Sequence, residues 1–345
     1  MRSIFATAAL VVLSGLAAAP SQAAQKYLEM CDASAAVAVD DGHFLAAGDE
    51  NEVVRLYRNT GKAEAPIGTF DFAGRLRDDP DREADIEGAA RIGNRIFWIT
   101  SHGRNRKGKR RPNRYRLFAT DLSVTPDRLK LAWTGRYDRL VDDLLDEAAW
   151  QGPSAEATKA VIDTLRAATR LNKKRVKKLA PKRRGLNIEG LAATPSGTGL
   201  LIGFRNPLPG GKALVVFLAN PNELVTDANT KARFVGIAEL DLGGLGIRSI
   251  EYAAAIRGYL ILAGPSGDGG PFKLYKWTGR RTAAPLEVHT LKTQKGRNPE
   301  ALVIYRDSPR IQILKDEGSF VFDGARCKDR RQPRKRFSDE WLVVN

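Results

Sequence analysis

Short apolar runs recur along this chain in pairs, and a polar turn separates the two runs of each pair. The clearest pairs begin at residues 85–88 (DIEG), 187–190 (NIEG), 249–252 (SIEY) and 298–301 (NPEA), each with a glutamate at the start of its first run. A weaker fifth pair spans residues 35–47. Apolar runs of this length, bounded by turn residues, predict β-hairpins.

The spacing of these hairpins predicts a β-propeller. Each hairpin is followed by further apolar runs, and the repeat is roughly 50 residues long except where a longer segment intervenes, as is typical of propeller blades. We predict an all-β protein in which residues 24–345 form a single propeller of five blades. Six blades are the alternative, with the end strands at 27–30 and 341–344 and part of the longer segment building another blade.

The longer segment, residues 138–184, has a helical pattern instead. Apolar residues recur at helical spacing between Leu140 and Leu145, and Ser154 is a suitable N-cap after a Gly-Pro break. We predict a helical hairpin inserted after the second blade. Its basic C-terminal part is expected to be either a solvated helix end or a lid that binds polyanions, and the basic loop 103–111 to be a solvated flap.

The first residues have the pattern of a secretory leader. Arg2 precedes an apolar stretch over residues 4–19, and a small-x-small cleavage site ends at Ala23. A membrane anchor is the alternative, although the stretch is short for a span of about 20 residues. We therefore predict a signal peptide over residues 1–23 and a periplasmic or secreted protein without stable membrane insertion.

The net charge of +16 indicates anionic partners, and removal of a leader that contains one arginine leaves 16 − 1 = +15. Because export argues against nucleic acid, we expect a phosphorylated or carboxylated small molecule, lipopolysaccharide or an anionic polysaccharide. The protein is expected to be a monomer.

Two cysteines, Cys31 and Cys327, lie near opposite ends of the predicted ring. A propeller must bring its ends together, and an oxidising compartment permits a bond there, so we predict a disulfide. Two buried free thiols are the alternative. Because no Cys-x-x-Cys is present, thiol-redox catalysis and a zinc ribbon are not indicated.

The predicted fold places a group of polar side chains at one mouth of the channel. The first strand of each blade lines the channel and pairs antiparallel with the second, so the start of the first lies beside the end of the second. Sites are usually built on strand ends and loops of a rigid scaffold. The side chains brought together would be Glu50, Glu87, His102, Glu189, Arg205, Glu251, Ser266, Glu300 and Lys315.

Four carboxylates around one axis repel one another. A cation between them, pairing with Arg or Lys, or raised pKa values of the carboxyl groups would relieve this repulsion. Glu87, Glu189, Glu251 and Glu300 together with the amides of Asn187 and Asn298 suit a hard cation, and we predict Ca2+. The alternative is structural, with each glutamate accepting backbone N–H bonds from the next blade and holding the ring closed.

His102 beside Glu87 is the candidate general base or proton shuttle, and a purely structural hydrogen-bonding histidine is the alternative. Ser266 is not in a Gly-x-Ser-x-Gly elbow and is not assigned as a nucleophile. No phosphate-binding loop, zinc-protease motif or dinucleotide fingerprint is present. The candidate substrate-binding residues are Arg104, Asn105, Arg205, Asn206, Ser266 and Lys315.

The motifs resemble the bacterial domain-of-unknown-function 3616 family. The likeness covers nearly the whole predicted mature chain and is carried by residues 85–88, 98–105, 187–192, 203–207, 240–252 and 298–302. It implies a propeller-like fold and no particular activity. The Glu-Gly repeat is also similar, in architecture, to exported phytase-like esterases and calcium-dependent lactonase propellers.

Two functional hypotheses follow. One is a metal-assisted hydrolase of an anionic ester, lactone or phosphoester, in which calcium polarises the substrate and His102 moves a proton. The other is a non-catalytic binding protein for anionic glycans or lipids. A mouth filled by Arg–Glu pairs would favour the second.

Overall fold

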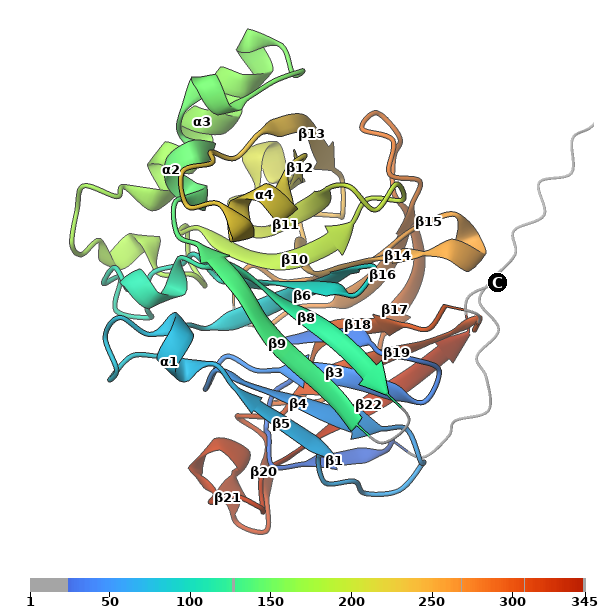
Figure 1. Ribbon diagram of the computed structural model, residues 1–345. Coiled ribbons are helices and arrows are strands. Elements are labelled where there is room, and N and C mark those ends of the chain that lie inside the picture. Colours follow the sequence, from blue (N-terminus) through green and yellow to red (C-terminus); the bar gives the residue numbers. More distant parts are fainter. Residues whose placement is uncertain (1–23, 126–127, 268, 307, 344–345) are drawn as a thin grey trace, which may run out of the picture.

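Five four-stranded antiparallel sheets make up most of the described chain (Figure 1). The structure is a computed structural model that describes residues 24–125, 128–267, 269–306 and 308–343. In hydrogen-bonded order the sheets are β2 (Ala35–Ala38), β3 (His43–Ala47), β4 (Val53–Arg58) and β5 (Gly68–Asp71); β6 (Ile86–Ile92), β7 (Arg95–Thr100), β8 (Leu117–Thr125) and β9 (Arg128–Tyr137); β10 (Asn187–Ala193), β11 (Leu200–Asn206), β12 (Ala213–Leu218) and β13 (Phe234–Leu240); β14 (Gly246–Ala253), β15 (Gly258–Gly264), β16 (Phe272–Trp277) and β17 (Leu286–Leu291); and β18 (Asn298–Ile304), β19 (Arg310–Asp316), β22 (Arg336–Val343) and β1 (Lys26–Leu28).

The sheets are arranged in a closed ring. Strands β2, β6, β10, β14 and β18, the first strands of the five repeats, each contact the first strands of the two neighbouring sheets, and the contact between β18 and β2 completes the circle. Sheets that radiate in this way from a central channel form a β-propeller. The all-β propeller predicted from the repeats is confirmed.

The apolar core lies between neighbouring sheets, as β7 illustrates. Ile96 and Trp98 pack between the first and second sheets, whereas Phe97 and Ile99 pack between the second and third. All four side chains are buried, because each sheet of the ring is covered on both faces. Burial of a large apolar side chain contributes about 2–3 kcal/mol, so this packing dominates the stability of the ring.

Two small residues allow the first strands to approach one another near the mouth. A Cβ atom on Gly88 would lie 3.0 Å from the carbonyl oxygen of Glu189, and one on Gly190 would lie 2.8 Å from Cγ2 of Ile247. The glycine in each Glu-Gly pair is therefore required by close packing around the channel.

The two ends of the chain close the ring together. Strand β1 pairs antiparallel with β22, so both predicted end strands belong to one sheet. Cys31 and Cys327 form the predicted disulfide, with Cα atoms 5.8 Å apart and a sequence separation of 296 residues. For a loop of this length the chain-entropy treatment gives a stabilisation on the order of 5 kcal/mol, an upper figure.

A short hairpin interrupts the last sheet between β19 and β22. It consists of β20 (Val321–Phe322) and β21 (Ala325–Arg326), followed by the 3-10 helix η6 (Cys327–Asp329), and Figure 1 shows it at the edge of the ring. This hairpin is a separate two-stranded sheet, and β22 takes the place beside β19 in the fifth four-stranded sheet. The guanidinium groups of Arg330 and Arg336 lie 4.0 and 3.9 Å from the Phe322 ring centroid, so cation–π contacts hold the hairpin.

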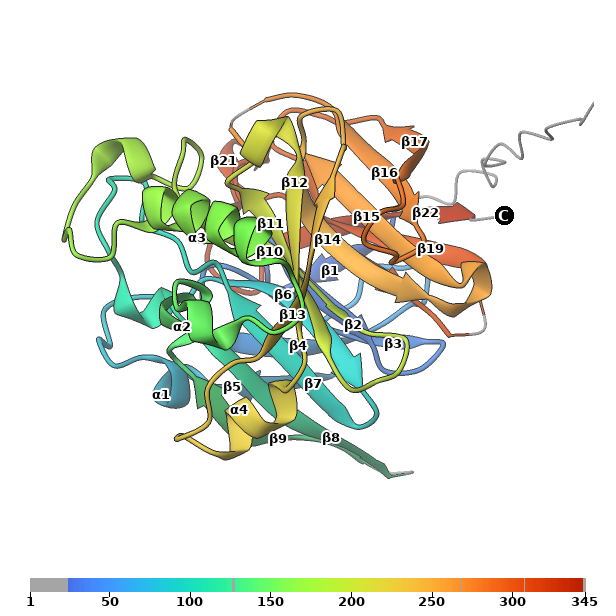
Figure 2. The ribbon, with the colours of Figure 1, turned by 90° about the horizontal axis from the view of Figure 1, so that it is seen from above.

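The insertion after the second sheet contains the expected helices. They are α2 (Leu140–Leu144), η2 (Glu147–Ala149), α3 (Ala155–Thr169) and η3 (Lys177–Leu179), and Ser154 caps α3 by accepting a hydrogen bond from Ala157 N. Val161 and Leu165 of α3 pack into the core between the second and third sheets, and Figure 2 shows α3 beside these sheets. The remaining helices are α1 (Ala73–Leu76), η1 (Pro112–Arg114), η4 (Pro209–Gly211), α4 (Pro221–Thr226) and η5 (Ala254–Ile256).

The predicted signal peptide, residues 1–23, lies outside the described residues. Within the described part of the chain, every helix is too short or too polar to cross a membrane.

Candidate functional site

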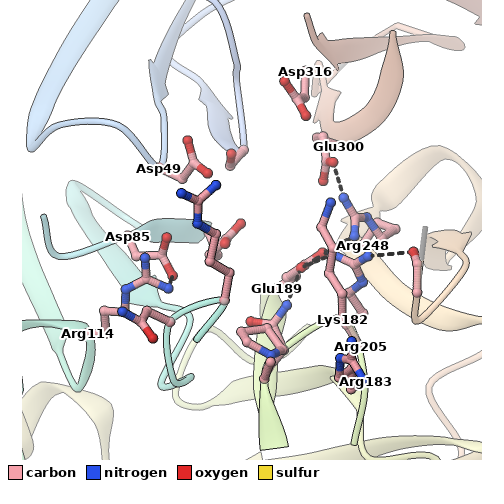
Figure 3. Close-up of a pocket in the computed structure, with 18 of the residues that line it drawn as sticks. Asp49, Asp85, Arg114, Lys182, Arg183, Glu189, Arg205, Arg248, Glu300 and Asp316 are labelled. Carbon is pink, nitrogen blue, oxygen red and sulfur yellow. Dashed lines mark hydrogen bonds and ion pairs between the residues drawn. The ribbon is translucent and has the colours of Figure 1, made fainter. Parts of the chain in front are cut away.

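A cavity of about 1080 Å3 opens at the mouth of the channel, where the first strands of the sheets begin (Figure 3). All five sheets contribute to it, and the loop after β7 and the end of the insertion form its outer rim. The residues from the sheets and their strand ends are Ser34, Asp49, Asp85, Glu87, Asn187, Glu189, Arg205, Arg248, Asn298, Glu300 and Asp316.

A β-bulge at the start of four first strands turns one polar side chain into this mouth. In β6 the pairing with β7 passes from Ile86 to Gly88 and skips Glu87. The same shift skips one residue in β10, β14 and β18. A bulge leaves the extra residue unpaired and re-aims its side chain. The residues at this position are Glu87, Glu189, Arg248 and Glu300.

The fourth sheet departs from the pattern expected from the sequence. Its bulge is at Arg248, because the pairing with β15 passes from Ile247 to Ser249. Glu251 lies three residues further along β14, pairs with Leu260 and does not line the cavity. The alignment that equated Glu251 with the other three glutamates is therefore corrected. Burial raises the pKa of Glu251 well above its ordinary value.

Arginines neutralise two of the three mouth glutamates. Arg205 Nη1 donates to Glu189 Oε1 at 2.9 Å, Arg248 Nη1 lies 3.0 Å from Glu189 Oε2, and Arg248 Nη2 donates to Glu300 Oε1. Asn187 Nδ2 also donates to Glu189 Oε1, at 2.6 Å. All five side chains are at least nine-tenths buried. We call Asn187, Glu189, Arg205, Arg248 and Glu300 the inner cluster.

Carboxyl groups with fewer cationic partners line the same cavity as the inner cluster. Figure 3 shows Asp49 and Asp85 on one side and Arg205 and Arg248 on the other. Asp85 pairs with Arg114, at 2.8 Å between Oδ2 and Nη1, whereas Asp49 and Glu87 make no ion pair with any described residue. We call Asp49, Asp85 and Glu87 the acidic pole.

The surroundings of the acidic pole disfavour ionisation. Burial, and then the charge of Glu189, raises the pKa of Glu87 well above its ordinary value. The neighbouring Asp32 carboxyl group raises the pKa of Asp49 well above its ordinary value, and burial raises the pKa of Asp32 itself to about 7. Glu87 and Asp32 are shielded from water and Asp49 is repelled by its neighbour, and too little positive charge is present to offset these effects.

The outer rim is strongly basic. Arg106, Lys107 and Lys109 from the loop and Lys182 and Arg183 from the insertion line the cavity, and all five side chains are exposed. We call these five residues the basic rim. The two segments are joined by backbone hydrogen bonds, from Arg110 N to Lys174 O at 3.0 Å and from Val176 N to Gly108 O at 2.9 Å. The rim is therefore one structure built from two segments.

Arg104 anchors this rim, which differs from the expected solvated flap. Its side chain is 2% exposed, and its guanidinium group donates to backbone carbonyl oxygens of Gly108, Thr169, Arg170, Lys173 and Lys174. Those carbonyl groups include the C-terminal end of α3, which a cation stabilises. Arg104 does not line the cavity, and its donors are engaged by the protein itself.

His102 lies behind the mouth rather than in it. The side chain is fully buried, does not line the cavity, and packs edge-on against Tyr115 with ring centroids 5.8 Å apart. Its Nδ1 lies 2.8 Å from the carbonyl oxygen of Thr100, so Nδ1 carries the proton and Nε2 is left without a partner among the described residues. Burial lowers the pKa of His102 to about 4, which keeps the ring neutral.

The other predicted site residues separate into two groups. Asn105, Asn298 and Arg205 line the cavity. Asn206 lies outside the lining, and its Nδ2 donates to the carbonyl oxygens of Pro181 and Ser266. Lys315 and Glu50 also lie outside the lining. Lys315 pairs with Glu340 at 3.1 Å, and Glu50 pairs with Lys335 at 2.5 Å.

Several lining residues were missed from the sequence. Arg248 had a usable signal, because GIRS at 246–249 repeats the pattern of DIEG and NIEG, with a polar third residue followed by a small one. Asp316 ends β19 and Asp49 follows the end of β3 by two residues, and each is one position away from the expected Lys315 or Glu50. Lys182 and Arg183 had been noted only as part of a basic run.

Several of the predicted calcium ligands have other partners or another place in this structure. Glu189 and Glu300 are occupied by arginine, Glu251 is displaced from the mouth, and within the described ranges no three Asp, Glu, His or Cys side chains are grouped so as to hold a metal ion. Calcium binding stays a prediction from the sequence, and we derive no chemistry through it.

Comparison with known proteins identifies one family. A family model described as "Protein of unknown function (DUF3616)" matches residues 32–304. No curated protein sequence matches the chain.

Solved structures similar to the chain include propellers of low sequence identity. A putative oxidoreductase (glucose dehydrogenase) from Thermus thermophilus has 11% identity and a TM-score of 0.41, with 95% of this chain and 100% of that chain covered. The PQQ-bound aldose sugar dehydrogenase of Streptomyces coelicolor has 9% identity and a TM-score of 0.41, with coverage of 95% and 98%. The β-propeller domain of Cps50 (Swd1) from Myceliophthora thermophila has 10% identity and a TM-score of 0.35, with coverage of 90% and 82%.

Proposed function

The chain belongs to the DUF3616 family of proteins of unknown function, and from that premise we propose that it is an exported five-bladed β-propeller that binds an anionic glycan at its channel mouth. The observation that carries the proposal is the basic rim. Five exposed cationic side chains from two joined segments surround the entrance of one cavity. A cleft lined by one sign of charge concentrates ligands of the opposite sign.

The lining favours a carbohydrate over an acyl chain. Apart from Ala180, Pro181, Pro265 and Phe272 the cavity is lined by charged side chains, amides, one hydroxyl and glycines. Acyl chains need continuous apolar surface, whereas sugar hydroxyl groups form hydrogen bonds with carboxylates, amides and guanidinium groups. Anionic lipids are therefore less suited to this cavity than anionic glycans.

The inner cluster supports binding rather than metal-dependent chemistry. Arg205 and Arg248 neutralise Glu189 and Glu300, which is the arrangement expected of a binding protein. Export is supported by the leader-like sequence of residues 1–23 and by the Cys31–Cys327 disulfide, which is stable in an oxidising compartment.

Calorimetric titration with matched glycans tests this proposal. The purified protein should bind heparin oligosaccharides or polygalacturonate oligosaccharides, and it should not bind neutral dextran of the same length. Binding should weaken steeply between low and physiological salt, because exposed charges are screened over about 8–10 Å at physiological ionic strength. The charge-reversed variant Lys182→Glu with Arg183→Glu should bind at least tenfold more weakly.

A control variant has the same change in charge at a distant place. Arg128→Glu with Lys130→Glu alters exposed side chains on β9, and neither residue lines the cavity. If both double variants lose affinity equally, binding reflects the net charge of the protein and the mouth is not the site.

A hydrolase of an anionic ester, lactone or phosphoester is the second candidate, and Glu87 favours it. A carboxyl group with a raised pKa at the floor of a cavity can protonate a leaving group near neutral pH. Because His102 lies outside the lining, the proton-transfer role predicted for it passes to Glu87 in this candidate. A panel of ester, lactone and phosphoester substrates, assayed with calcium and with chelator, tests it. Absence of turnover, or turnover that survives Glu87→Gln, would reject it.

A further inference from the structure

The two signs of charge are unevenly distributed within the cavity. Among the described residues, seven carboxyl groups line it, and Arg114, Arg205 and Arg248 form ion pairs with four of them. Of the remaining lining cations, Lys182 acts on the carboxyl group of Asp316, and the others are the rest of the basic rim and its neighbours Arg82 and Arg111. A ligand that enters the mouth therefore passes from a cationic entrance to a floor with excess negative charge.

The excess negative charge is concentrated at the acidic pole. Glu87 has neither an ion pair nor a side-chain hydrogen bond with any described residue, and Asp49, which is exposed to the cavity, has no ion pair with one. The charged groups that act on Glu87 include the carboxyl groups of Asp49, Asp85, Glu189 and Glu300. The guanidinium groups of Arg114 and Arg248 also act on it, but each of them is already paired with other carboxyl groups. A neutral hydroxyl group could accept or donate one hydrogen bond here, but only a cation would remove the repulsion.

An independent observation points to the same kind of ligand. Asn187 lines the cavity and is 3% exposed, and its Nδ2 donates to Glu189, which fixes the orientation of the amide. The other amide atom, Oδ1, has no hydrogen-bond partner in the described part of the chain. Oδ1 can only accept a hydrogen bond, so this position next to the glutamates requires a donor.

We infer that the acidic pole and Asn187 bind an ammonium group, so that the ligand is an anionic glycan with a free amine. The amine enters first and reaches the floor, while the anionic groups stay at the basic rim. An ammonium group has three donors and no acceptor, which matches carboxyl groups and an unpaired amide oxygen. A metal ion is disfavoured because no three acidic, histidine or cysteine side chains of the described residues are grouped to ligate one.

Ammonium binding should be linked to proton release. Burial and neighbouring carboxyl groups raise the pKa of Glu87, and Asp32 raises that of Asp49, so these carboxyl groups hold their protons more strongly than ordinary ones do. A bound cation favours the ionised form and lowers these pKa values. Up to about one proton per bound ligand should therefore leave the protein.

The inference rests on the proposed function, and three sugar phosphates separate the two. Glucose 6-phosphate has the anion but no amine, glucosamine 6-phosphate has both, and N-acetylglucosamine 6-phosphate has an amide in place of the amine. Glucosamine 6-phosphate should bind about ten- to hundredfold more tightly than either of the others, the range expected for a charge-assisted hydrogen bond. Titration in two buffers of different ionisation enthalpy should show proton release for that probe alone.

Substitutions at the pole sharpen the test. In Glu87→Gln and in Asp49→Asn the ratio of the affinities for the amine and hydroxyl probes should fall toward one, and proton release should decrease. Glu223→Gln, an exposed glutamate paired with Arg233 at 3.2 Å, should keep the full ratio. Circular dichroism and thermal unfolding of each variant establish that it is folded.

The outcomes distinguish the two proposals. Equal affinity for the three probes would overturn the ammonium site and leave the anion-binding mouth standing. No binding of any probe at millimolar concentration would overturn both. If calcium displaces the amine probe and itself binds more tightly, the pole is a metal site and the inference fails.

Discussion

The inner cluster and the basic rim use the same kinds of charged side chain, a few residues apart in the cavity wall, in opposite ways. In the inner cluster Glu189 is 2% exposed and is held between two arginines. In the rim, Lys107 and Arg183 are exposed to solvent. The inner charges have been removed from water and depend on one another, whereas the rim charges remain hydrated and act at a distance.

Because of this difference, the inner cluster and the basic rim should contribute to different properties, the first to folding stability and the second to the attraction of ligands. Removing one member of a buried ion pair leaves an uncompensated charge, whereas an exposed charge contributes little to folding and is screened by salt. The inner cluster should therefore determine whether the mouth folds, and the rim should determine what approaches it. The following variants test that division.

Glu189→Gln should have the largest effect. The change keeps the shape of the side chain but leaves Arg205 and Arg248 without their shared carboxylate. Loss of one partner of a buried pair typically costs about 3–5 kcal/mol of unfolding free energy. Urea unfolding measures the loss, and the exposed Glu223→Gln should stay within about 0.5 kcal/mol of the unsubstituted protein.

The same variant tests the calcium prediction. If the glutamate only pairs with arginine, its loss should lower the melting temperature equally in calcium and in chelator. A ligand bound only by the folded state adds RT ln(1+[L]/Kd) to stability. If the substitution lowers the melting temperature in calcium but not in chelator, Glu189 is a metal ligand.

His102→Asn should change the pH dependence of stability. Because burial lowers the folded-state pKa of His102 from 6.5 to about 4, the unfolded chain takes up the proton first as the pH falls. This group should therefore cost the native protein on the order of 3 kcal/mol between pH 6.5 and pH 4. Asparagine tolerates the positive φ of 51° at this position and removes the titration.

Urea unfolding at pH 7 and at pH 4.5 measures this difference. The carboxyl groups titrate in both proteins, so the quantity of interest is the loss in the native protein minus the loss in the variant. Identical losses would contradict a buried neutral His102 and would restore a solvent-linked, catalytic role as the better interpretation.

Arg104→Ala should have an intermediate and local effect. It removes the guanidinium group that joins the loop after β7 to the end of α3. Charge-assisted hydrogen bonds contribute about 2 kcal/mol, so hydrogen exchange in residues 105–111 and 170–178 should accelerate roughly thirtyfold. Arg106→Ala, an exposed neighbour, should leave exchange unchanged. Faster exchange throughout the ring in Arg104→Ala would show that the rim is not a separate unit.

Charge reversal in the rim should have the smallest effect on stability. Replacing Arg106, Lys107, Lys182 and Arg183 by glutamate should change the unfolding free energy by less than about 1 kcal/mol. Retention on a heparin column should nevertheless fall, and the retention of the unsubstituted protein should decrease steeply with salt. Unchanged retention would mean that the rim is only hydrated surface.

Much of the fold follows from the repeated hairpins. Their alternating apolar residues and turns indicate the strands, and the need to close a ring brings Cys31 and Cys327 together. Both strands at the chain ends could be identified from the sequence, but their pairing in one sheet could not. That union depends on the pairing of β1 with β22, which are separated by nearly the whole chain.

The site was less predictable, for two reasons. Arg104 and Arg106 lie in one polar loop, and nothing local indicates that the first turns inward and the second outward. His102 occupies the expected repeat position, yet its fully buried side chain lies outside the cavity lining. The inward orientation of Arg104 depends on the insertion, whose helix end supplies the carbonyl groups that accept its hydrogen bonds.

The sequence by itself determined the propeller repeat, the disulfide, the family and the presence of glutamates at the mouth, because these depend on local patterns and on closure of a ring. The sequence offered both GIRS and SIEY as the fourth repeat, and only the tertiary structure decided that Arg248, rather than Glu251, joins Glu189 and Glu300. Successive residues of a strand face opposite sides, so a slip of three positions exchanges the two faces. The bulge in β14, which depends on pairing with β15, places Arg248 rather than Glu251 at the mouth. Arg248 pairs with Glu189 and Glu300, so the mouth has an ion-paired cluster beside an acidic pole instead of the four carboxylates predicted.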